Sequence, residues 1–300
     1  MTNQTQSFLV RRFEQVGIRP RTKQGQNFLI DLNLLRLLFE TARIDHRDVV
    51  LEIGAGTGSL TALMASAAAA VVSVEVDPQL HQLASEELVD FDNVTLLRQD
   101  ALANKNTLAP ALLETVRRRL DEAPGRRFKL AANLPYRIAT PVISNLLACE
   151  LPPVTMTITI QKELADRIVA RPSTKDYGAL SIWVQCQCEV ELVRVMPPTA
   201  FWPRPKIHSA IVQIRVREDW RRQIPDLDFF HSFVRAMFFH RRKFLRSVVR
   251  SAYKDQLDKS DVDEIMARVG FGATTRAEEL DVAAHLRLCQ VVKEALAVRG

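Results

Sequence analysis

VVLEIGAGTGSLT, residues 49–61, joins a short apolar run to a glycine-rich turn and then to a second apolar segment. The run VVLEI is short and continuously apolar, which predicts a strand buried on both faces. Gly54, Gly56 and Gly58 stand at every second position after it, where the lack of Cβ atoms lets the backbone approach a ligand closely. The stretch therefore predicts the first strand, turn and helix of an α/β sheet, with a ligand site at the turn.

The same alternation of short apolar runs and helical stretches continues for the next hundred residues. Further strands are predicted at VVSVEV (71–76), VTLLRQD (94–100), KLAANL (129–134) and TMTITI (155–160). Strands that alternate with helices need crossover connections, which give a parallel sheet with helices on both faces. We expect a doubly wound, Rossmann-like α/β sheet that binds its ligand at the carboxyl ends of the strands.

The pattern changes after Tyr177. IWVQCQCEVEL (182–192) and SAIVQIRV (209–216) predict two longer strands that close the sheet as an antiparallel pair. A proline-rich connection separates them.

Beyond Asp219 the sequence predicts only helices. One of them opens with Ser260 and Asp263 at the spacing of a capping box and ends at Gly270. We therefore place the domain boundary near residue 218. Residues 1–218 would form the α/β domain with a basic N-terminal arm, and residues 219–300 a small all-helical domain.

The chain of 300 residues is 47% hydrophobic, enough for one domain and a smaller second one. No apolar stretch reaches the roughly 20 residues needed to cross a bilayer, and the first thirty residues lack the apolar core of a secretory signal. We expect a soluble, cytoplasmic protein that binds no membrane. Its four cysteines lack metal-ligand spacing, so we expect no metal site.

The formal net charge of +6 suggests an anionic partner, and the basic residues are concentrated in two places. Residues 1–25 hold a single acid, Glu14, beside five basic residues: Arg11, Arg12, Arg19, Arg21 and Lys23. Residues 235–250 hold no acid beside six basic residues: Arg235, Arg241, Arg242, Lys243, Arg246 and Arg250.

Two acids follow the glycine-rich turn at the ends of the next two predicted strands. Glu75 can accept hydrogen bonds from both hydroxyls of a ribose, and Asp100 can meet the exocyclic amine of an adenine. Both could instead cap the helices that follow, although Asp77 is the better cap after the second strand. A dinucleotide site would need glycine or alanine at position 59, where Ser59 stands. With no phosphate-binding cation nearby, the pattern favours S-adenosylmethionine over ATP or NAD.

The fourth predicted strand delivers Asn133, Leu134, Pro135 and Tyr136 to the same sheet edge. The Asn133 side-chain oxygen and the Leu134 carbonyl can accept hydrogen bonds from both hydrogens of an adenine N6, which drives that nitrogen toward tetrahedral geometry. Pro135 biases Leu134 to an extended conformation. Tyr136 can stack on a base removed from its helix. An ordinary turn is the alternative for these four residues taken alone.

With these motifs in order, the chain resembles the ribosomal RNA adenine N6-dimethyltransferases, which modify two adjacent adenosines near the 3′ end of small-subunit rRNA. The matching stretches span almost the whole chain: TKQGQNFLID (22–31), LEIGAGTGSLT (51–61), VEVD (74–77), QDAL (99–102), NLPYRIATP (133–141), QKELADRI (161–168), KDYGALSI (175–182), AFWPRPKIHSAIV (200–212) and HRRKFLR (240–246).

The resemblance implies that Asn27 and Leu29 join Gly54, Gly56, Glu75, Asp100 and Asn133 in binding the methyl donor. The residues alone favour another interpretation of Asn27 and Leu29, a helix entry capped by Asp31. Glu52 either faces the methionine ammonium of the donor or only supports the fold. The sequence departs from the family at Ala55, where proline is common, and at Arg137, where a small polar residue often stands. The arginine-rich segment 104–129 looks longer than usual and receives no role.

The resemblance also implies a partner, the small-subunit rRNA in an immature 30S particle. We expect the protein to be a monomer. Arg242, Arg246 and Arg250 recur at i, i+4 and i+8, so one helix could present them, together with Arg241 and Lys243, to RNA phosphates. An ordinary solvated face is the alternative for this basic run.

Three rival functions remain open. A related group methylates a single large-subunit rRNA adenine, but Leu134, the stretch 200–212 and the helical tail argue against it. DNA adenine methyltransferases usually carry proline in place of Leu134. A ribosome-assembly factor or transcription factor with a vestigial pocket is the rival from another class.

Overall fold

The structure, a computed structural model, describes residues 6–15, 17, 20 and 26–299. Arg19, Arg21 and Lys23 of the predicted basic arm lie outside the described residues. The chain divides into two compact units. One comprises Met1–Ala165 with Val190–Val216, and the other Asp166–Glu189 with Arg217–Gly300.

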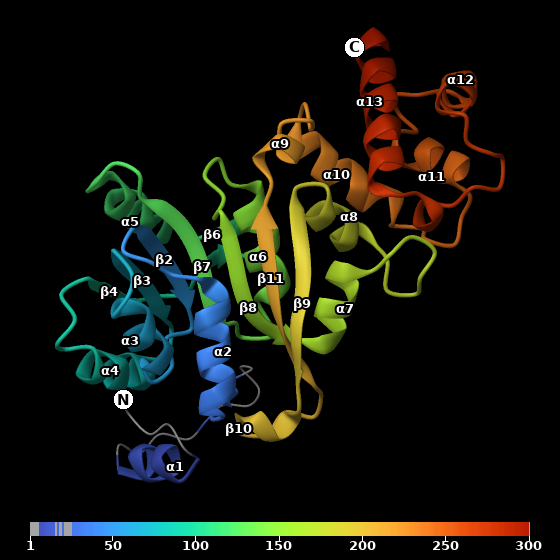
Figure 1. Cartoon of the computed structure of the whole chain (residues 1–300). Coiled ribbons are helices and arrows are strands. Elements are labelled where there is room, and N and C mark those ends of the chain that lie inside the picture. The colour runs from blue at the N-terminus through green and yellow to red at the C-terminus, as the bar shows by residue number, and fades with distance from the viewer. Residues whose placement is uncertain (1–5, 16, 18–19, 21–25, 300) are drawn as a thin grey trace. The chain divides into compact units, whose positions relative to one another are not determined.

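The first unit is built on a seven-stranded sheet in the order β4-β3-β2-β7-β8-β11-β9 (Figure 1). Its strands are β2 (Asp48–Ile53), β3 (Ala70–Glu75), β4 (Val94–Arg98), β7 (Arg127–Asn133), β8 (Thr155–Gln161), β9 (Cys188–Met196) and β11 (Ser209–Val216). The first five of these pair in parallel, and β11 runs antiparallel to β8. The strand order reverses between β2 and β7, which is where such sheets bind ligands. All five predicted parallel strands are confirmed.

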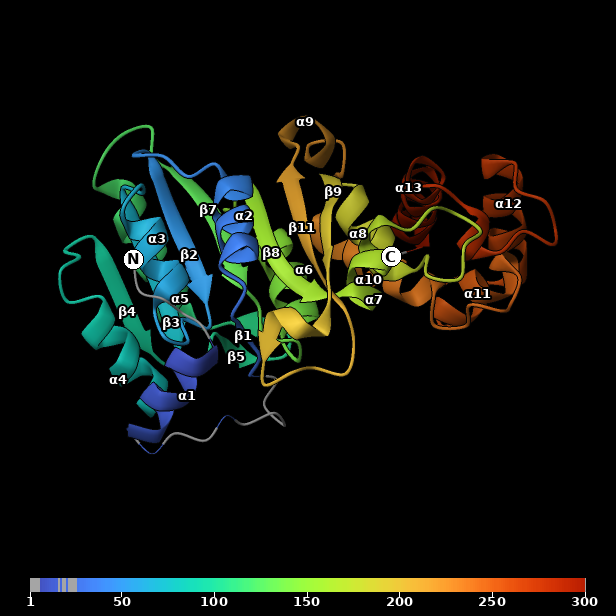
Figure 2. The ribbon, with the colours of Figure 1, turned by 60° about the horizontal axis from the view of Figure 1, so that its bottom comes forward.

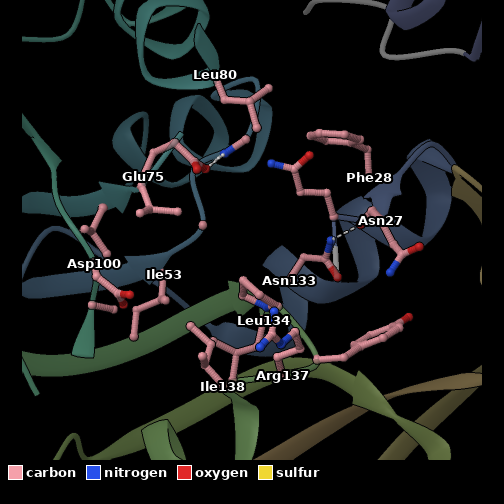
Figure 3. Close-up of a pocket in the computed structure, with 18 of the residues that line it drawn as sticks. Asn27, Phe28, Ile53, Glu75, Leu80, Asp100, Asn133, Leu134, Arg137 and Ile138 are labelled. Atoms are coloured by element: carbon pink, nitrogen blue, oxygen red, sulfur yellow. Dashed lines mark hydrogen bonds between the residues drawn. The ribbon is translucent and has the colours of Figure 1, made fainter. Parts of the chain in front are cut away.

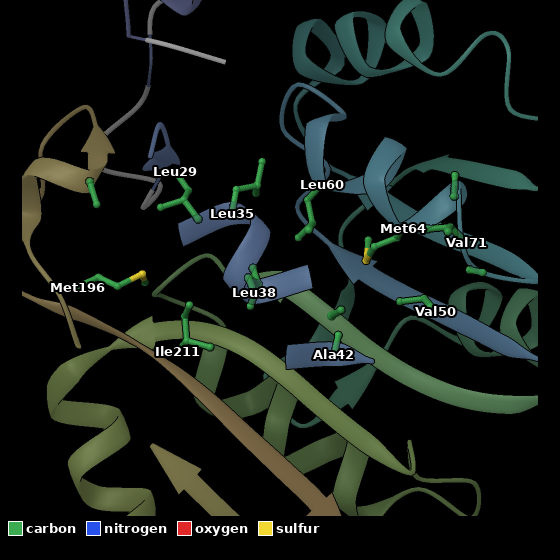
Figure 4. Close-up of a cluster of buried hydrophobic side chains, with 14 of the residues drawn as sticks. Leu29, Leu35, Leu38, Ala42, Val50, Leu60, Met64, Val71, Met196 and Ile211 are labelled. Carbon is green, nitrogen blue, oxygen red and sulfur yellow. The ribbon is translucent and has the colours of Figure 1, made fainter. Parts of the chain in front are cut away.

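Helices cover both faces of this sheet (Figure 2), as in a doubly wound fold. The helices of the first unit are α1 (Gln6–Gln15), α2 (Leu32–Ala42), α3 (Ser59–Ala65), α4 (Pro78–Glu87), α5 (Pro110–Asp121), α6 (Ala139–Ala148) and the first half of α7 (Lys162–Val169). Leu35 and Leu38 of α2 and Met64 of α3 pack into one hydrophobic cluster, which Figure 4 shows. Leu38 and Met64 are fully buried, so this apolar contact fixes α2 and α3 beside the end of β2.

Several short elements were not predicted: β1 (Phe28–Leu29), β5 (Leu102–Asn104), β6 (Thr107–Leu108), β10 (Phe201–Trp202) and the 3₁₀ turn η2 (Pro198–Ala200). β1 pairs antiparallel with β10, which places Phe28 opposite Trp202. The Phe13 ring of α1 lies 5.2 Å from the Phe28 ring and 5.5 Å from the Trp202 ring. This aromatic cluster holds α1 against the segment that leads into the ligand site.

The arginine-rich segment 104–129 supports the fold. Arg119 and Arg126 both pair with Glu122. Arg127 pairs with Asp48, a fully buried carboxylate at the start of β2. These cations are therefore engaged within the unit.

The second unit is helical. Its helices are α8 (Ala179–Gln185), α9 (Glu218–Arg221), α10 (Leu227–Met237), α11 (Leu245–Ala252), α12 (Lys259–Val269) and α13 (Val282–Arg299), with the 3₁₀ turn η3 (Ala277–Glu279). α10 contacts α8, α11 and α13, and α12 packs on α11 and α13. Within the described part of the chain, no helix is both long and apolar enough to cross a membrane.

The predicted strand over 182–192 is wrong in its first half, because residues up to Gln185 belong to α8 and β9 begins at Cys188. A short continuous apolar run fits a buried helix as well as a buried strand. Trp183 of α8 stacks on His231 of α10, with ring centroids 4.2 Å apart. Residues 166–189 therefore group with the helical unit, whereas a single boundary near 218 would place them in the first domain.

Helix α12 begins slightly earlier than predicted. Asp258, not Ser260, caps it by accepting the backbone N–H groups of Ser260 and Asp261 at 2.8 and 3.0 Å. The predicted end at Gly270 is confirmed, with that glycine at a φ of 71°.

Candidate active site

A cavity of about 400 Å³ opens at the carboxyl ends of β2, β3, β4 and β7 (Figure 3). This is the edge at which the sequence predicts ligand binding. Nine of the ten predicted cofactor and catalytic residues line the cavity: Asn27, Gly54, Gly56, Glu75, Asp100, Asn133, Leu134, Pro135 and Tyr136.

The tenth, Leu29, lies in the neighbouring hydrophobic cluster, with 3% of its surface exposed. Phe28 lines the cavity in its place, together with Leu80 and Ile138. No motif in the sequence indicates these three residues. The only signal for Phe28 was its position next to Asn27.

The glycine-rich turn places two motifs in contact. Gly54 has a φ of 89°, and a Cβ atom there would lie 3.3 Å from Pro135 Cγ. Glycine is required both for this backbone conformation and for the close approach of Pro135. The turn after β2 and the turn after β7 therefore form one wall of the cavity.

Glu75 is held by backbone groups on the cavity wall. Its carboxylate accepts the Gly56 N–H at 2.9 Å and the Asp77 N–H at 3.0 Å. Burial raises the pKa of Glu75, while these two hydrogen bonds oppose that shift. Asp77, not Glu75, caps α4, by accepting the N–H groups of Gln79 and Leu80. A carboxylate has about four acceptor sites, so Glu75 keeps capacity for a ligand's hydroxyls.

Asp100 follows β4 and is exposed. Its Oδ1 accepts the Leu102 N–H at 2.9 Å, which fixes the side chain in an Asx turn. The second carboxylate oxygen remains available to a donor in the cavity.

Asn133 ends β7 with its amide oriented by one hydrogen bond. Its Nδ2 donates to the Asn27 carbonyl at 2.9 Å, so the side-chain oxygen is the group left to accept. The following peptide is held too, because the Leu134 N–H donates to the Thr159 carbonyl of β8 at 3.2 Å. The turn thus presents fixed hydrogen-bond acceptors to the cavity.

The Tyr136 ring is held at its hydroxyl, which shares a short hydrogen bond with the Ser209 hydroxyl of β11. Burial raises the pKa of Tyr136, so the phenol stays neutral at physiological pH. A neutral ring anchored at one end presents its faces as an apolar stacking surface.

Glu52 is one residue from the end of β2 but points away from the cavity. Its carboxyl accepts hydrogen bonds from the hydroxyls of Thr61 and Ser73. Complete burial raises the pKa of Glu52 to about 8. Of the two roles left open by the sequence, the structure favours support of the fold.

The predicted RNA-contacting residues separate into two groups. Arg241 pairs with Glu278 and donates to the carbonyls of Thr174 and Lys175, and Arg246 pairs with Asp263. The other three, Arg242, Lys243 and Arg250, are exposed and form no ion pair within the described ranges. α11 begins only at Leu245, so the predicted three-turn helical stripe is wrong at Arg242, which precedes the helix.

Comparison with known proteins gives one consistent result. A family model described as ribosomal RNA adenine dimethylase matches residues 17–290. The ribosomal RNA small subunit methyltransferase A of Streptococcus gordonii is 38% identical over 281 residues, covering 93% of this chain and 94% of that protein. The enzyme of the same name from Listeria innocua is 36% identical, covering 95% and 94%.

Two solved structures share the fold. A dimethyladenosine transferase from Plasmodium falciparum has a TM-score of 0.72 at 23% identity, covering 88% of this chain and 96% of that one. The 23S rRNA methyltransferase ErmE has a TM-score of 0.62 at 25% identity, covering 89% and 100%.

Proposed function

The chain belongs to the ribosomal RNA adenine dimethylase family, and from this premise we propose which reaction its site performs and how. The enzyme transfers methyl groups from S-adenosylmethionine to N6 of two adjacent adenosines near the 3′ end of small-subunit rRNA. The product is N6,N6-dimethyladenosine. The names of its relatives, at up to 38% identity over most of the chain, support this substrate.

The residues around the cavity fit the methyl donor. Glu75, at the end of β3, has acceptor capacity for two ribose hydroxyls, and Asp100 has a free oxygen for the adenine amine. The backbone at Gly54 and Gly56 borders the cavity without Cβ obstruction. When bound, S-adenosylmethionine supplies an electrophilic methyl group on its sulfonium.

The turn after β7 receives the target adenine. The Asn133 side-chain oxygen and the Leu134 carbonyl accept hydrogen bonds from the two N6 hydrogens. Tyr136 stacks on the adenine base after this base has left the RNA helix. One observation supports this assignment above all: the bond from Asn133 Nδ2 to the Asn27 carbonyl leaves the amide oxygen as the available acceptor. Positioning of this kind contributes roughly 7 to 11 kcal/mol in well-oriented reactions, so no strong base is required.

The preferred particle, the compartment and the oligomeric state are further parts of the proposal. The enzyme acts as a monomer in the cytoplasm on an immature 30S particle, where the small-subunit rRNA is still accessible. The second unit contributes RNA affinity through Arg242, Lys243 and Arg250, which are exposed cations.

The test supplies the purified protein with labelled S-adenosylmethionine and either immature 30S particles or 23S rRNA. Dimethyladenosine at two adjacent positions of the small-subunit rRNA is expected. Asn133→Ala and Tyr136→Ala, if still folded by circular dichroism, should each slow transfer; loss of a preorganised polar contact commonly lowers kcat by roughly 100-fold or more. Methylation of 23S rRNA alone, or binding of 30S particles without transfer, would contradict the proposal.

A further inference from the structure

A second cavity lies in the helical unit, between α10 and α11. Its volume is about 500 Å³, within the range of roughly 300 to 1,000 Å³ typical of ligand sites. Its wall includes the side chains of Ser232, Arg235, Phe239, His240, Val248 and Ser251. None of the active-site residues described above contributes to it.

Phe239 is the unusual residue of this cavity, because 81% of its surface is exposed. The preceding Phe238 turns inward and packs edge-on against Tyr177 at 6.3 Å between ring centroids. The His240 ring contacts Phe239 edge-on at 4.8 Å, which supports the exposed ring from one side. Phe239 therefore offers a flat apolar face to solvent at the edge of a cavity.

The charged residues nearest to this face along the chain are all basic. The sequence holds no Asp or Glu from residue 229 to residue 254. Arg235 lines the cavity, is exposed and has no ion pair among the residues described. Arg242 and Lys243, two and three residues after His240, are also exposed. A polyanion is the partner that such a surface attracts.

An exposed ring beside a cavity and unpaired cations is the combination that binds single-stranded nucleic acid. Successive bases stack on aromatic side chains, while cations follow the backbone. A base inside an A-form duplex has no face available for stacking on a protein ring, so the cavity selects an unpaired nucleotide.

We propose that the cavity between α10 and α11 holds an unpaired base of the rRNA substrate, stacked on Phe239 with a neighbouring phosphate bound by Arg235. Through this site the helical unit would bind the particle, while the first unit would bind the target adenines. The inference rests on the proposed function for the identity of the RNA. The binding chemistry itself rests on the cavity, the exposed ring and the charge.

The test measures binding of the full-length protein to two fluorescein-labelled RNAs, a short single strand and a blunt duplex of the same sequence. Phe239→Ala should weaken single-strand binding by roughly 5- to 150-fold, the fold-change that corresponds to loss of one stacked base. Phe239→Trp should retain binding. Phe239→Leu is the matched control, since it keeps an apolar side chain but removes the flat ring, and it should behave like Phe239→Ala. Duplex binding should change little in all three variants.

A single strand containing 4-thiouridine provides a second measurement. Irradiation should crosslink it to a peptide within residues 232–252 of the wild-type protein. Equal loss of single-strand and duplex affinity in Phe239→Ala would overturn the base-binding site. Unchanged single-strand affinity in Phe239→Ala, or no crosslink to that peptide in the wild-type protein, would also overturn it.

Transfer of labelled methyl groups to 30S particles separates this inference from the proposed function. If the wild-type protein methylates the particles while Phe239→Ala binds single strands normally, only the further inference fails. If the wild-type protein methylates no rRNA adenine but Phe239→Ala still loses single-strand binding, the cavity is an RNA site and the proposed reaction fails.

Discussion

The hydroxyl pair of Tyr136 and Ser209 decides how firmly the base-stacking ring is held. Ser209→Ala removes the hydrogen bond that holds the Tyr136 hydroxyl and should lower kcat/KM for methylation roughly 2- to 12-fold, the equivalent of one typical hydrogen bond. Tyr136→Phe should have the same effect, because it breaks the same bond and keeps the ring. The double variant should be no worse than either single variant. Steady-state assays on 30S particles check this, and additive losses would show that Ser209 acts on something other than the ring.

Glu52 gives the protein a pH-dependent stability. Burial raises the pKa of its carboxyl from about 4.5 to about 8, so the folded state favours the protonated form. The stabilisation that the buried, protonated carboxyl contributes to the folded state is complete below about pH 4.5. It is lost as the pH rises to about 8, at roughly 1.4 kcal/mol of unfolding free energy per pH unit. Glu52→Gln stays neutral and should lack this loss. Urea unfolding at a series of pH values should therefore show the variant gaining stability over the wild type as the pH rises. Parallel curves for the two proteins would refute this.

Glu52 and Glu75 also show which residue roles a sequence can reveal. Glu75 is the last residue of β3, and the carboxyl ends of parallel strands converge, so its place in the site could be predicted. Glu52 lies opposite Ser73 in the pairing of β2 with β3, and this register, which favours its supporting role, cannot be seen in the sequence. The bond between Tyr136 and Ser209 joins residues 73 positions apart, so no local pattern indicates it.

At the scale of elements, the turn after β2 packs so closely against the turn after β7 that a change in one should displace the other. Gly54→Ala would force a Cβ atom toward Pro135 Cγ, 3.3 Å away, besides imposing a left-handed backbone cost of roughly 1 to 2 kcal/mol. It should lower both affinity for S-adenosylmethionine and the rate of methylation. Gly270→Ala is the matched control, because Gly270 also has a positive φ but nothing lies within 4 Å of its Cβ position.

Calorimetric melting, donor binding and methylation of the two glycine variants give the comparison. Gly270→Ala should lower the melting temperature and leave donor affinity unchanged well below that temperature. If both variants lost donor affinity equally, contact with Pro135 would not be the cause of the Gly54→Ala defect.

Element prediction succeeded where burial and length gave a strong pattern, as in the five parallel strands. It failed at α8, where Leu180, Ile182, Trp183 and Val184 are all buried and leave no polar face to reveal a helical period. β1 and β10 are two residues each, too short for any alternation to appear. Their pairing places Phe28 at the cavity, so this part of the site could not be predicted from periodicity.

At the scale of the whole molecule, the two units divide the chain differently from a single cut near residue 218. The segment Asp166–Glu189 packs within the helical unit, and the chain then returns to the sheet through β9. Contacts between segments far apart in sequence assign Asp166–Glu189 to the helical unit. The sequence predicts no domain boundary at either end of this segment. The assignment of residues 1–218 to methyl transfer and 219–300 to RNA binding stays a proposal, to which the structure adds that 166–189 belong with the helical unit.

The helical unit should supply salt-dependent affinity for RNA through its exposed cations. Changing Arg242, Lys243 and Arg250 together to Gln should reduce the slope of log affinity for 30S particles against log salt concentration by roughly 2 to 3, at about 0.7 to 0.9 per phosphate contact. Arg241→Gln is the control from the same basic run. Its guanidinium is engaged with Glu278 and two carbonyls, so its loss should lower the melting temperature and leave the slope nearly unchanged. A reduced slope in Arg241→Gln, with none in the triple variant, would place the RNA contacts elsewhere on the protein.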